Sequence, residues 1–116
     1  MMSREQLLTP IPLKQKTVTI SGGDVTIRQL SHSEAAKWDM WQRPNGKLDE
    51  ERKLNRDLKL ITMCVIDSDG QLILTEDDIP ALSAQPSDFT SELSYQVMLI
   101  NGFLVEVEDL AGKSDS

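Results

Sequence analysis

Two side chains in this sequence have the chemistry of catalysts or metal ligands, but neither has a companion at a useful spacing. His32 is the single histidine, and no cysteine or second histidine stands near it to complete a metal site. Cys64 is the single cysteine, so it cannot form an internal disulfide, which suits a reducing compartment. Because Cys64 falls on the apolar face of an expected helix with no base nearby, we expect a thiol packed in the core.

The acidic residues group in two places, and neither group forms a recognisable site. Residues 67–70 read Asp-Ser-Asp-Gly, but an EF-hand needs glycine sixth in its loop and an oxygen ligand first, where this chain has Val65. Glu76, Asp77 and Asp78 offer carboxylates for acid–base catalysis, yet adjacent residues at a helix start project in different directions and serve the helix dipole. The sequence therefore predicts a protein that is not an enzyme and holds no metal and no cofactor.

Charge is divided unevenly along the chain. The 116 residues carry a net charge of −7, with a sequence pI of about 4.6. Residues 1–66 hold eleven Lys and Arg against eight Asp and Glu, a net +3, whereas residues 67–116 hold one Lys against eleven acids, a net −10. Phosphate neutralisation supplies most non-specific affinity for nucleic acid, so we expect no nucleic-acid partner. The acidic half either keeps the protein soluble as a solvated surface, or orients head-to-tail self-association and attracts a basic partner.

The length and the ends of the chain predict a single domain in the cytoplasm. No run reaches the roughly 18 apolar residues of a membrane helix, and the start MMSREQLLTPIP lacks the apolar core of a signal peptide, so we expect no membrane partner. Prolines in residues 1–12 hold the backbone extended and favour a flexible N-terminal arm. We expect a single α+β domain over residues 13–110 and a disordered tail over residues 111–116.

A helix expected over residues 48–66 organises the rest of the fold. Leu54, Leu58, Ile61 and Val65 recur at steps of four, three and four, which places them on one face of a 3.6-residue period. This helix is polar at its start and apolar nearly all round at its end, so it should enter the core.

Alternating residues predict a small sheet beside that helix. Residues 16–20 and 25–30 alternate polar and apolar side chains, and Gly22 and Gly23 provide a turn with positive φ, which together predict a β-hairpin. The short apolar run 71–74 is expected to join the hairpin as a third strand.

Capping signals predict three further helices. Ser31 and Glu34 have the spacing of a capping box, which begins a helix ending before Pro44. A second box at residues 75–78 begins a short helix that ends near Ser83, and a last helix spans residues 89–100 before the stop Asn101-Gly102. The predicted fold class is α+β, with a small antiparallel sheet (the N-terminal hairpin plus a short third strand) packed on a bundle of about four helices.

The candidates for binding a partner are one aromatic residue and two groups of acids. Trp38 and Trp41 share a helix face, and we expect Trp38 in the core, whereas Trp41 either pins its helix to the core or is an exposed anchor. The candidate partner-binding residues are Trp41, Glu76, Asp77, Asp78, Glu106, Glu108 and Asp109.

The order of these motifs resembles the tail assembly chaperones of long-tailed phages over roughly residues 11–103. Members of that family share a strand reading I-R-x-L-S into a capped helix, here residues 27–31, and a helix ending C-V-x-D-x-D-G, here residues 64–70. They also share a helix start T-x-x-D-[IV]-x-x-L, here residues 75–82, and a final helix closing on L-N-G, where residues 100–102 of this chain read Ile-Asn-Gly. These motifs are structural rather than catalytic.

The resemblance implies a non-enzymatic protein that binds the tape measure protein, a long helical protein prone to aggregation. It also implies that the protein helps recruit the major tail (tube) protein, forms a homo-oligomer in the host cell cytoplasm, and is absent from the mature virion. Two other functions stay open, a minor structural tail or connector subunit of the virion and a small acidic regulatory binding protein that mimics DNA.

Overall fold

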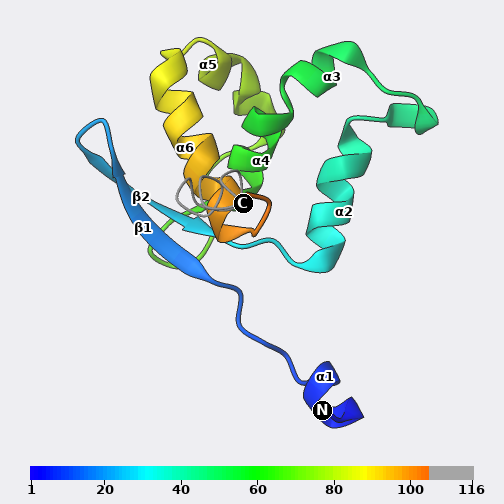
Figure 1. Ribbon diagram of the computed structural model, residues 1–116. Coiled ribbons are helices and arrows are strands. Elements are labelled where there is room, and N and C mark those ends of the chain that lie inside the picture. The colour runs from blue at the N-terminus through cyan, green and yellow to red at the C-terminus, as the bar shows by residue number, and fades with distance from the viewer. Residues whose placement is uncertain (105–116) are drawn as a thin grey trace, which may run out of the picture.

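The computed structural model describes residues 1–104, so the candidate residues Glu106, Glu108 and Asp109 and the expected tail lie outside the described residues. An antiparallel sheet of order β1-β2-β3 lies beside a group of helices (Figure 1), which confirms the α+β class. None of the helices within residues 1–104 is long and apolar enough to cross a membrane. In chain order the elements are α1 (Arg4–Leu8), β1 (Gln15–Ile20), β2 (Gly23–Arg28), α2 (His32–Trp41), the 3-10 helix η1 (Pro44–Gly46), α3 (Glu50–Leu54), α4 (Arg56–Cys64), β3 (Val65–Ile66), the 3-10 helix η2 (Glu76–Asp78), α5 (Ile79–Ser83) and α6 (Ser87–Ile100).

The predicted hairpin is present, with a turn one residue earlier than expected. Strands β1 and β2 pair antiparallel with Val18 opposite Val25, and the inner face of the hairpin is covered by α6. The two turn residues with positive φ are Ser21 and Gly22, not the predicted Gly22 and Gly23, because Gly23 already belongs to β2. Two positive φ values between paired strands match the twist of a hairpin, which is why so short a connection suffices.

The third strand differs from the prediction. Strand β3 is formed by Val65 and Ile66, which pair antiparallel with Ile27 and Thr26 of β2. These β-branched residues were expected to extend the central helix, but a neighbouring strand offers their backbone a ladder that outweighs helix continuation. The run 71–74, predicted as the strand, makes only an isolated bridge from Leu72 to Ile66.

The predicted central helix is divided in two at Asn55, where φ is −100° and ψ is 11°. Asparagine is a poor helix former, and the direction of the chain changes between α3 and α4 (Figure 1). Leu54, expected on the inner face, is 82% exposed, whereas Leu60 and Ile61 of α4 are fully buried. The prediction that the apolar end of this segment enters the core is therefore confirmed for α4 and wrong for Leu54.

The capping box at the start of α2 is confirmed, and it also ties α2 to the sheet. The Ser31 hydroxyl accepts from the backbone N–H of Glu34 at 3.3 Å, and the Glu34 carboxylate accepts from the Ser31 N–H at 3.0 Å. Arg28 at the end of β2 donates two hydrogen bonds to the same carboxylate, at 3.0 and 2.7 Å. Hydrogen bonds to the charged form, those of Arg28 first, lower the pKa of Glu34 to about 2.

The core lies where α4 and α6 meet the inner face of the hairpin. Leu93 and Val97 of α6 are buried there, and Trp38 packs against the core from α2, as expected. The Trp38 indole N–H donates to the Arg56 carbonyl at 2.8 Å, and its ring stacks on Phe103 with the centroids 5.4 Å apart.

Asn101, predicted only as a helix stop, joins three elements through its side chain. Its Oδ1 accepts from the Leu30 backbone N–H at 2.7 Å, so this N–H has a hydrogen-bond acceptor where the chain leaves β2. Its Nδ2 donates to the Val97 carbonyl at 2.8 Å and lies 3.7 Å from the Cys64 Sγ at the end of α4. Gly102 follows with a φ of 74° and ends α6, as expected.

We predict that Asn101→Ala lowers the free energy of unfolding by about 1–3 kcal/mol, because the Leu30 N–H then loses its acceptor inside the protein. Urea unfolding followed by circular dichroism measures this change. The control is Gln71→Ala, whose side chain is exposed. Equal unfolding midpoints for the two variants would contradict the assigned role of Asn101.

We predict that Glu34→Gln costs about 2 kcal/mol of stability near neutral pH, less than a full pKa shift implies because the side chain is 31% exposed. A carboxyl whose pKa falls on folding stabilises the protein above its ordinary pKa of 4.5, and this contribution is lost as the pH falls toward about 2. Urea titrations over this range should therefore bring Glu34→Gln and the parent protein together. Asp39→Asn, which breaks the exposed Asp39–Arg43 pair, is the control and should change stability little throughout.

Candidate binding surfaces

The predicted acidic group at the start of η2 is present, and its three carboxylates have different surroundings. Asp78 accepts from the Thr75 backbone N–H at 2.7 Å, which confirms the second capping box. Glu76 reaches to Trp41, and the Asp77 side chain is exposed to solvent. The described residues hold no group of three or more His, Cys, Asp or Glu side chains arranged for a metal ion.

Trp41 and Glu76, which were selected separately from the sequence, meet in the structure. The Trp41 indole N–H donates to Glu76 Oε1 at 2.6 Å, and Lys59 Nζ lies 3.3 Å from the same oxygen. The Arg52 guanidinium lies 5.1 Å and the Lys59 ammonium 5.6 Å from the centroid of the Trp41 ring. These contacts place two cations next to the Trp41 ring and connect α2 to α3, α4 and η2.

The charges around Glu76 favour its ionised form. Burial opposes ionisation of this carboxyl, but the hydrogen bonds from Trp41 and Lys59, together with the nearby charges of Lys59 and Arg52, outweigh burial and lower its pKa. A shallow cavity of about 250 Å³ opens beside the cluster, between Trp41 and Pro80. The role of Trp41 and Glu76 in binding a partner stays a prediction.

The two residues with catalytic chemistry lie apart and in opposite surroundings. His32 is exposed at the first position of α2. Cys64 is fully buried, and its desolvation raises the pKa of the thiol to about 11, so it is protonated at neutral pH. Core packing of Cys64 is confirmed.

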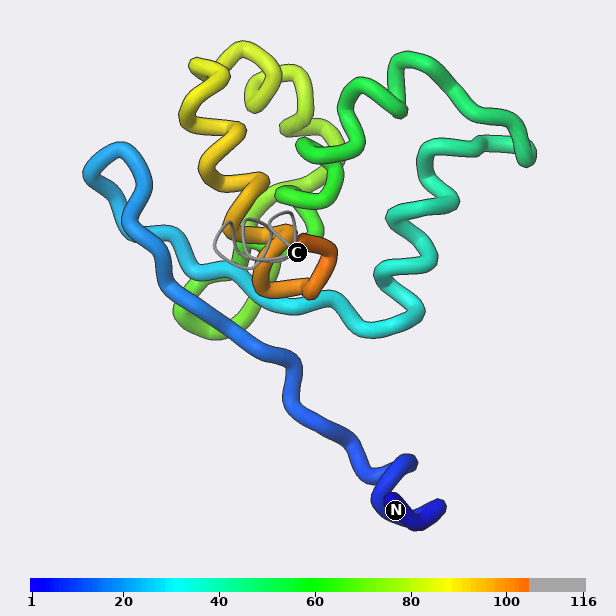
Figure 2. The backbone as a smooth tube through the Cα atoms, viewed as in Figure 1, coloured from blue at the N-terminus to red at the C-terminus, as the bar shows by residue number. Residues whose placement is uncertain are grey.

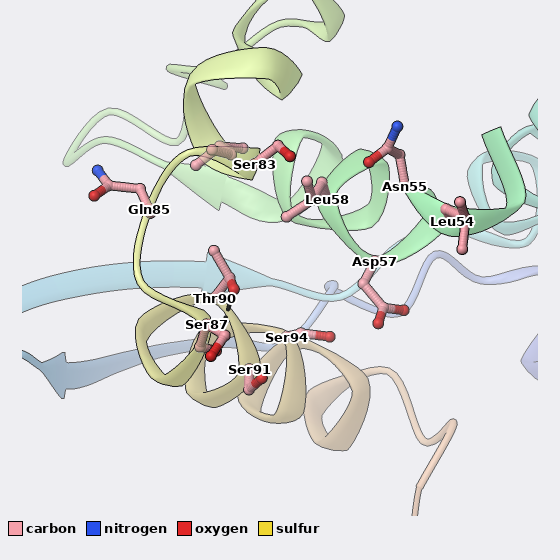
Figure 3. A pocket seen from close by; sticks show the side chains of 11 residues that line it. Leu54, Asn55, Asp57, Leu58, Ser83, Gln85, Ser87, Thr90, Ser91 and Ser94 are labelled. Carbon is pink, nitrogen blue, oxygen red and sulfur yellow. Dashed lines mark hydrogen bonds between the residues drawn. The ribbon is translucent and has the colours of Figure 1, made fainter. Parts of the chain in front are cut away.

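A polar groove runs between the start of α4 and the start of α6 (Figure 3). Its volume is about 260 Å³, and small hydroxyl side chains of α6 line one wall, among them Thr90, Ser91 and Ser94. Asn55 and Asp57 of the opposite wall come from the point where the central helix bends. Because the wall side chains are mainly short and neutral, this groove offers little apolar area to bury against a partner.

A larger apolar groove separates the sheet from the start of α6 and has a volume of about 440 Å³. Asp24 and Asp67 stand at the same groove. Ile73, which the sequence assigned to a strand, is 56% exposed here. The walls are formed chiefly by Val25, Val65, Ile73, Leu74, Phe89 and Leu93. We refer to this feature as the apolar groove.

Sequence reasoning did not find the apolar groove, because its walls come from β2, β3, the following loop and α6. One sequence signal did point to it. The run Leu72-Ile73-Leu74 places three large aliphatic residues in succession, whereas a half-buried strand buries only alternate residues. At least one of the three must then face solvent or a partner.

Comparison with known proteins finds a shared fold. No family model matches this chain, and no curated protein matches it either. The solved structure of the bacteriophage HK97 tail assembly chaperone matches with a TM-score of 0.57 and 19% sequence identity, over 84% of this chain and 90% of that one. At this level of identity, the likeness shows that the two chains have the same fold.

We predict that Trp41→Phe raises the pKa of Glu76 and lowers the free energy of unfolding by about 1 kcal/mol, because an aromatic ring stays next to the cations but the N–H that donates to Glu76 is lost. Carboxyl titration by NMR and urea unfolding measure the two effects. The control is Gln71→Ala at an exposed, uncharged residue, and it should leave both quantities unchanged. A Glu76 titration that is identical in Trp41→Phe and the parent protein would show that the indole does not hold this carboxylate in solution.

Proposed function

We propose that this protein is a non-enzymatic tail assembly chaperone of a phage or prophage. In this proposal it acts in the host cytoplasm, binds the tape measure protein, and helps to bring the major tail protein to it. It associates with copies of itself while doing so and is absent from the mature virion.

The observation that carries the proposal is the fold shared with the HK97 tail assembly chaperone over most of both chains. The motifs that suggested the family from sequence take the structural roles that the resemblance requires. Residues 27–31 lead from β2 into the capped start of α2, and residues 75–82 form the capped start of α5. Residues 100–102 end α6 through Asn101 and Gly102.

The surface chemistry favours protein binding over catalysis. The thiol of Cys64 is buried and protonated, and the carboxylates of Glu76 and Asp78 are engaged by Trp41, Lys59 and the Thr75 backbone. What remains available is an acidic half with a net charge of −10 and an apolar groove, both of which suit a partner that is basic and partly apolar.

The experiment is affinity capture of the tagged full-length chain from cells that make the complete set of tail proteins, followed by mass spectrometry. We expect recovery of the tape measure protein, together with absence of the tagged chain from purified tails. Finding the chain at fixed stoichiometry inside finished tails would instead show a structural subunit. Recovery of a host DNA-binding protein without tail proteins would show an acidic regulator.

The acidic half provides a prediction with a matched control. We expect Glu106→Gln/Glu108→Gln to weaken capture of the tape measure protein several-fold at low salt, because the negative charge of the C-terminal half attracts a basic partner, and this loss should shrink at high salt. The control is Glu50→Gln/Glu51→Gln, which removes the same charge from the exposed first turn of α3. Equal capture by the two variants would exclude a specific role for the carboxylates of Glu106 and Glu108.

A further inference from the structure

The predicted N-terminal arm of residues 1–12, together with Leu13, extends away from the rest of the protein (Figure 2), and these residues are called the arm below. Every residue of the arm is exposed, including Leu7 at 65%, Leu8 at 63% and Ile11 at 76%. Within residues 1–104, the hydrogen bonds of the arm join arm residues only, such as Ser3 to Gln6. The arm therefore displays aliphatic side chains that no other element covers.

Helix α1 is ordered by local signals alone, and these cannot sustain it in water. Ser3 and Gln6 form a complete capping box, but the helix has only five residues and buries none of them. Isolated helices much shorter than about 12 residues are unstable in water, because nucleation costs more than a few hydrogen bonds return. A short capped helix with exposed leucines needs a surface to pack against.

The apolar groove has the chemistry that complements the arm. Its walls are aliphatic and aromatic, and Ile73 is left 56% exposed on one of them. The carboxylates of Asp24 and Asp67 stand at this groove, whereas the arm and the residue after it carry Arg4 and Lys14 against the single acid Glu5. Apolar contact and opposite charge thus favour the same pairing.

Within one copy, the arm and the apolar groove lie toward different ends of the sheet. The arm joins β1 at Gln15, which pairs with Arg28, while the groove is lined by residues 24–26, nearer the hairpin turn. The arm continues away from the sheet toward the N-terminus (Figure 1), and Pro10 and Pro12 restrict how sharply it can reverse. The arm can reach the apolar groove of a second copy without turning back on itself.

We propose that the N-terminal arm of one copy binds in the apolar groove of a second copy, with the leucines of α1 and Ile11 against the groove walls. The interface is heterologous, so a pair of copies leaves one arm free at one end and one groove free at the other, and the assembly grows into an open chain or closes into a ring. The two prolines reduce the conformational entropy that the arm loses on binding. This inference deepens the self-association in the proposed function, but its test needs no tail protein.

The test measures self-association of the purified full-length chain by sedimentation velocity over a range of concentrations. We expect the parent protein to form species larger than a dimer. Leu8→Asn/Ile11→Asn in the arm and Ile73→Arg in the groove should each weaken association at least about tenfold, because they remove apolar contact, and Ile73→Arg also repels the basic arm. All three sites are exposed, so circular dichroism should show folded variants. The control is Met40→Asn/Leu54→Asn, two exposed residues outside both surfaces, and it should associate as the parent does.

Mixing the two defective variants is the decisive measurement. The arm variant keeps an intact groove and the groove variant keeps an intact arm, so the mixture should form a 1:1 complex that grows no further. A parent protein that stays monomeric at every concentration, association that survives both variants, or a mixture that stays monomeric would each overturn the proposal. Loss of tape measure capture with self-association intact would count against the proposed function alone.

Discussion

The side chain of Asn101 satisfies a constraint on which the arrangement of sheet and helices depends. Where the chain turns beside an apolar core, its buried backbone N–H and C=O groups need hydrogen-bond partners, because apolar side chains offer none. Asn101 accepts from Leu30 where β2 gives way to α2, donates to the last turn of α6, and approaches the Cys64 sulfur at the end of α4. One amide thus fixes the relative positions of the three segments that enclose Val97 and Ile27, both fully buried. The Arg28–Glu34 pair acts next to it, because it holds the first turn of α2 against the same end of the sheet.

The elements that could be predicted from sequence are those whose signals are local. The capping boxes that begin at Ser31 and Thr75 each depend on residues no more than three positions apart. The helix stop at Gly102 depends on the conformation of that one residue. All three are present in the structure. The errors occur where a distant partner decides the outcome. Val65 and Ile66 continue the apolar period of the helix before them, but β2 captures their backbone as a strand. Leu54 fits the helical stripe and yet faces solvent, because the bend at Asn55 turns α3 away from the core.

For the candidate surfaces too, single residues could be predicted from sequence, whereas contacts between distant segments could not. Trp41 and Glu76 could each be selected by residue type, but their hydrogen bond joins positions 35 residues apart, and no spacing rule predicts it. The apolar groove depends on where β3 forms, so an incorrect third strand also conceals the groove. In the arm, two prolines indicated an extended chain, and they concealed the capping box of Ser3 and Gln6 that orders α1 just before them.

The apolar side chains of this protein are divided between a buried core and two exposed surfaces. A small domain gains stability from each aliphatic residue that it buries, yet this one leaves Leu7, Leu8 and Ile11 on an arm and Ile73 at a groove. Single exposed apolar residues are common on protein surfaces. Here, however, several lie together on the arm, and Ile73 lines the apolar groove. An arm that must leave its own copy to be covered couples the order of α1 to association. In the proposed arrangement, assembly covers the apolar residues of the arm and the groove, so the surface that the protein presents to a partner differs before and after it assembles.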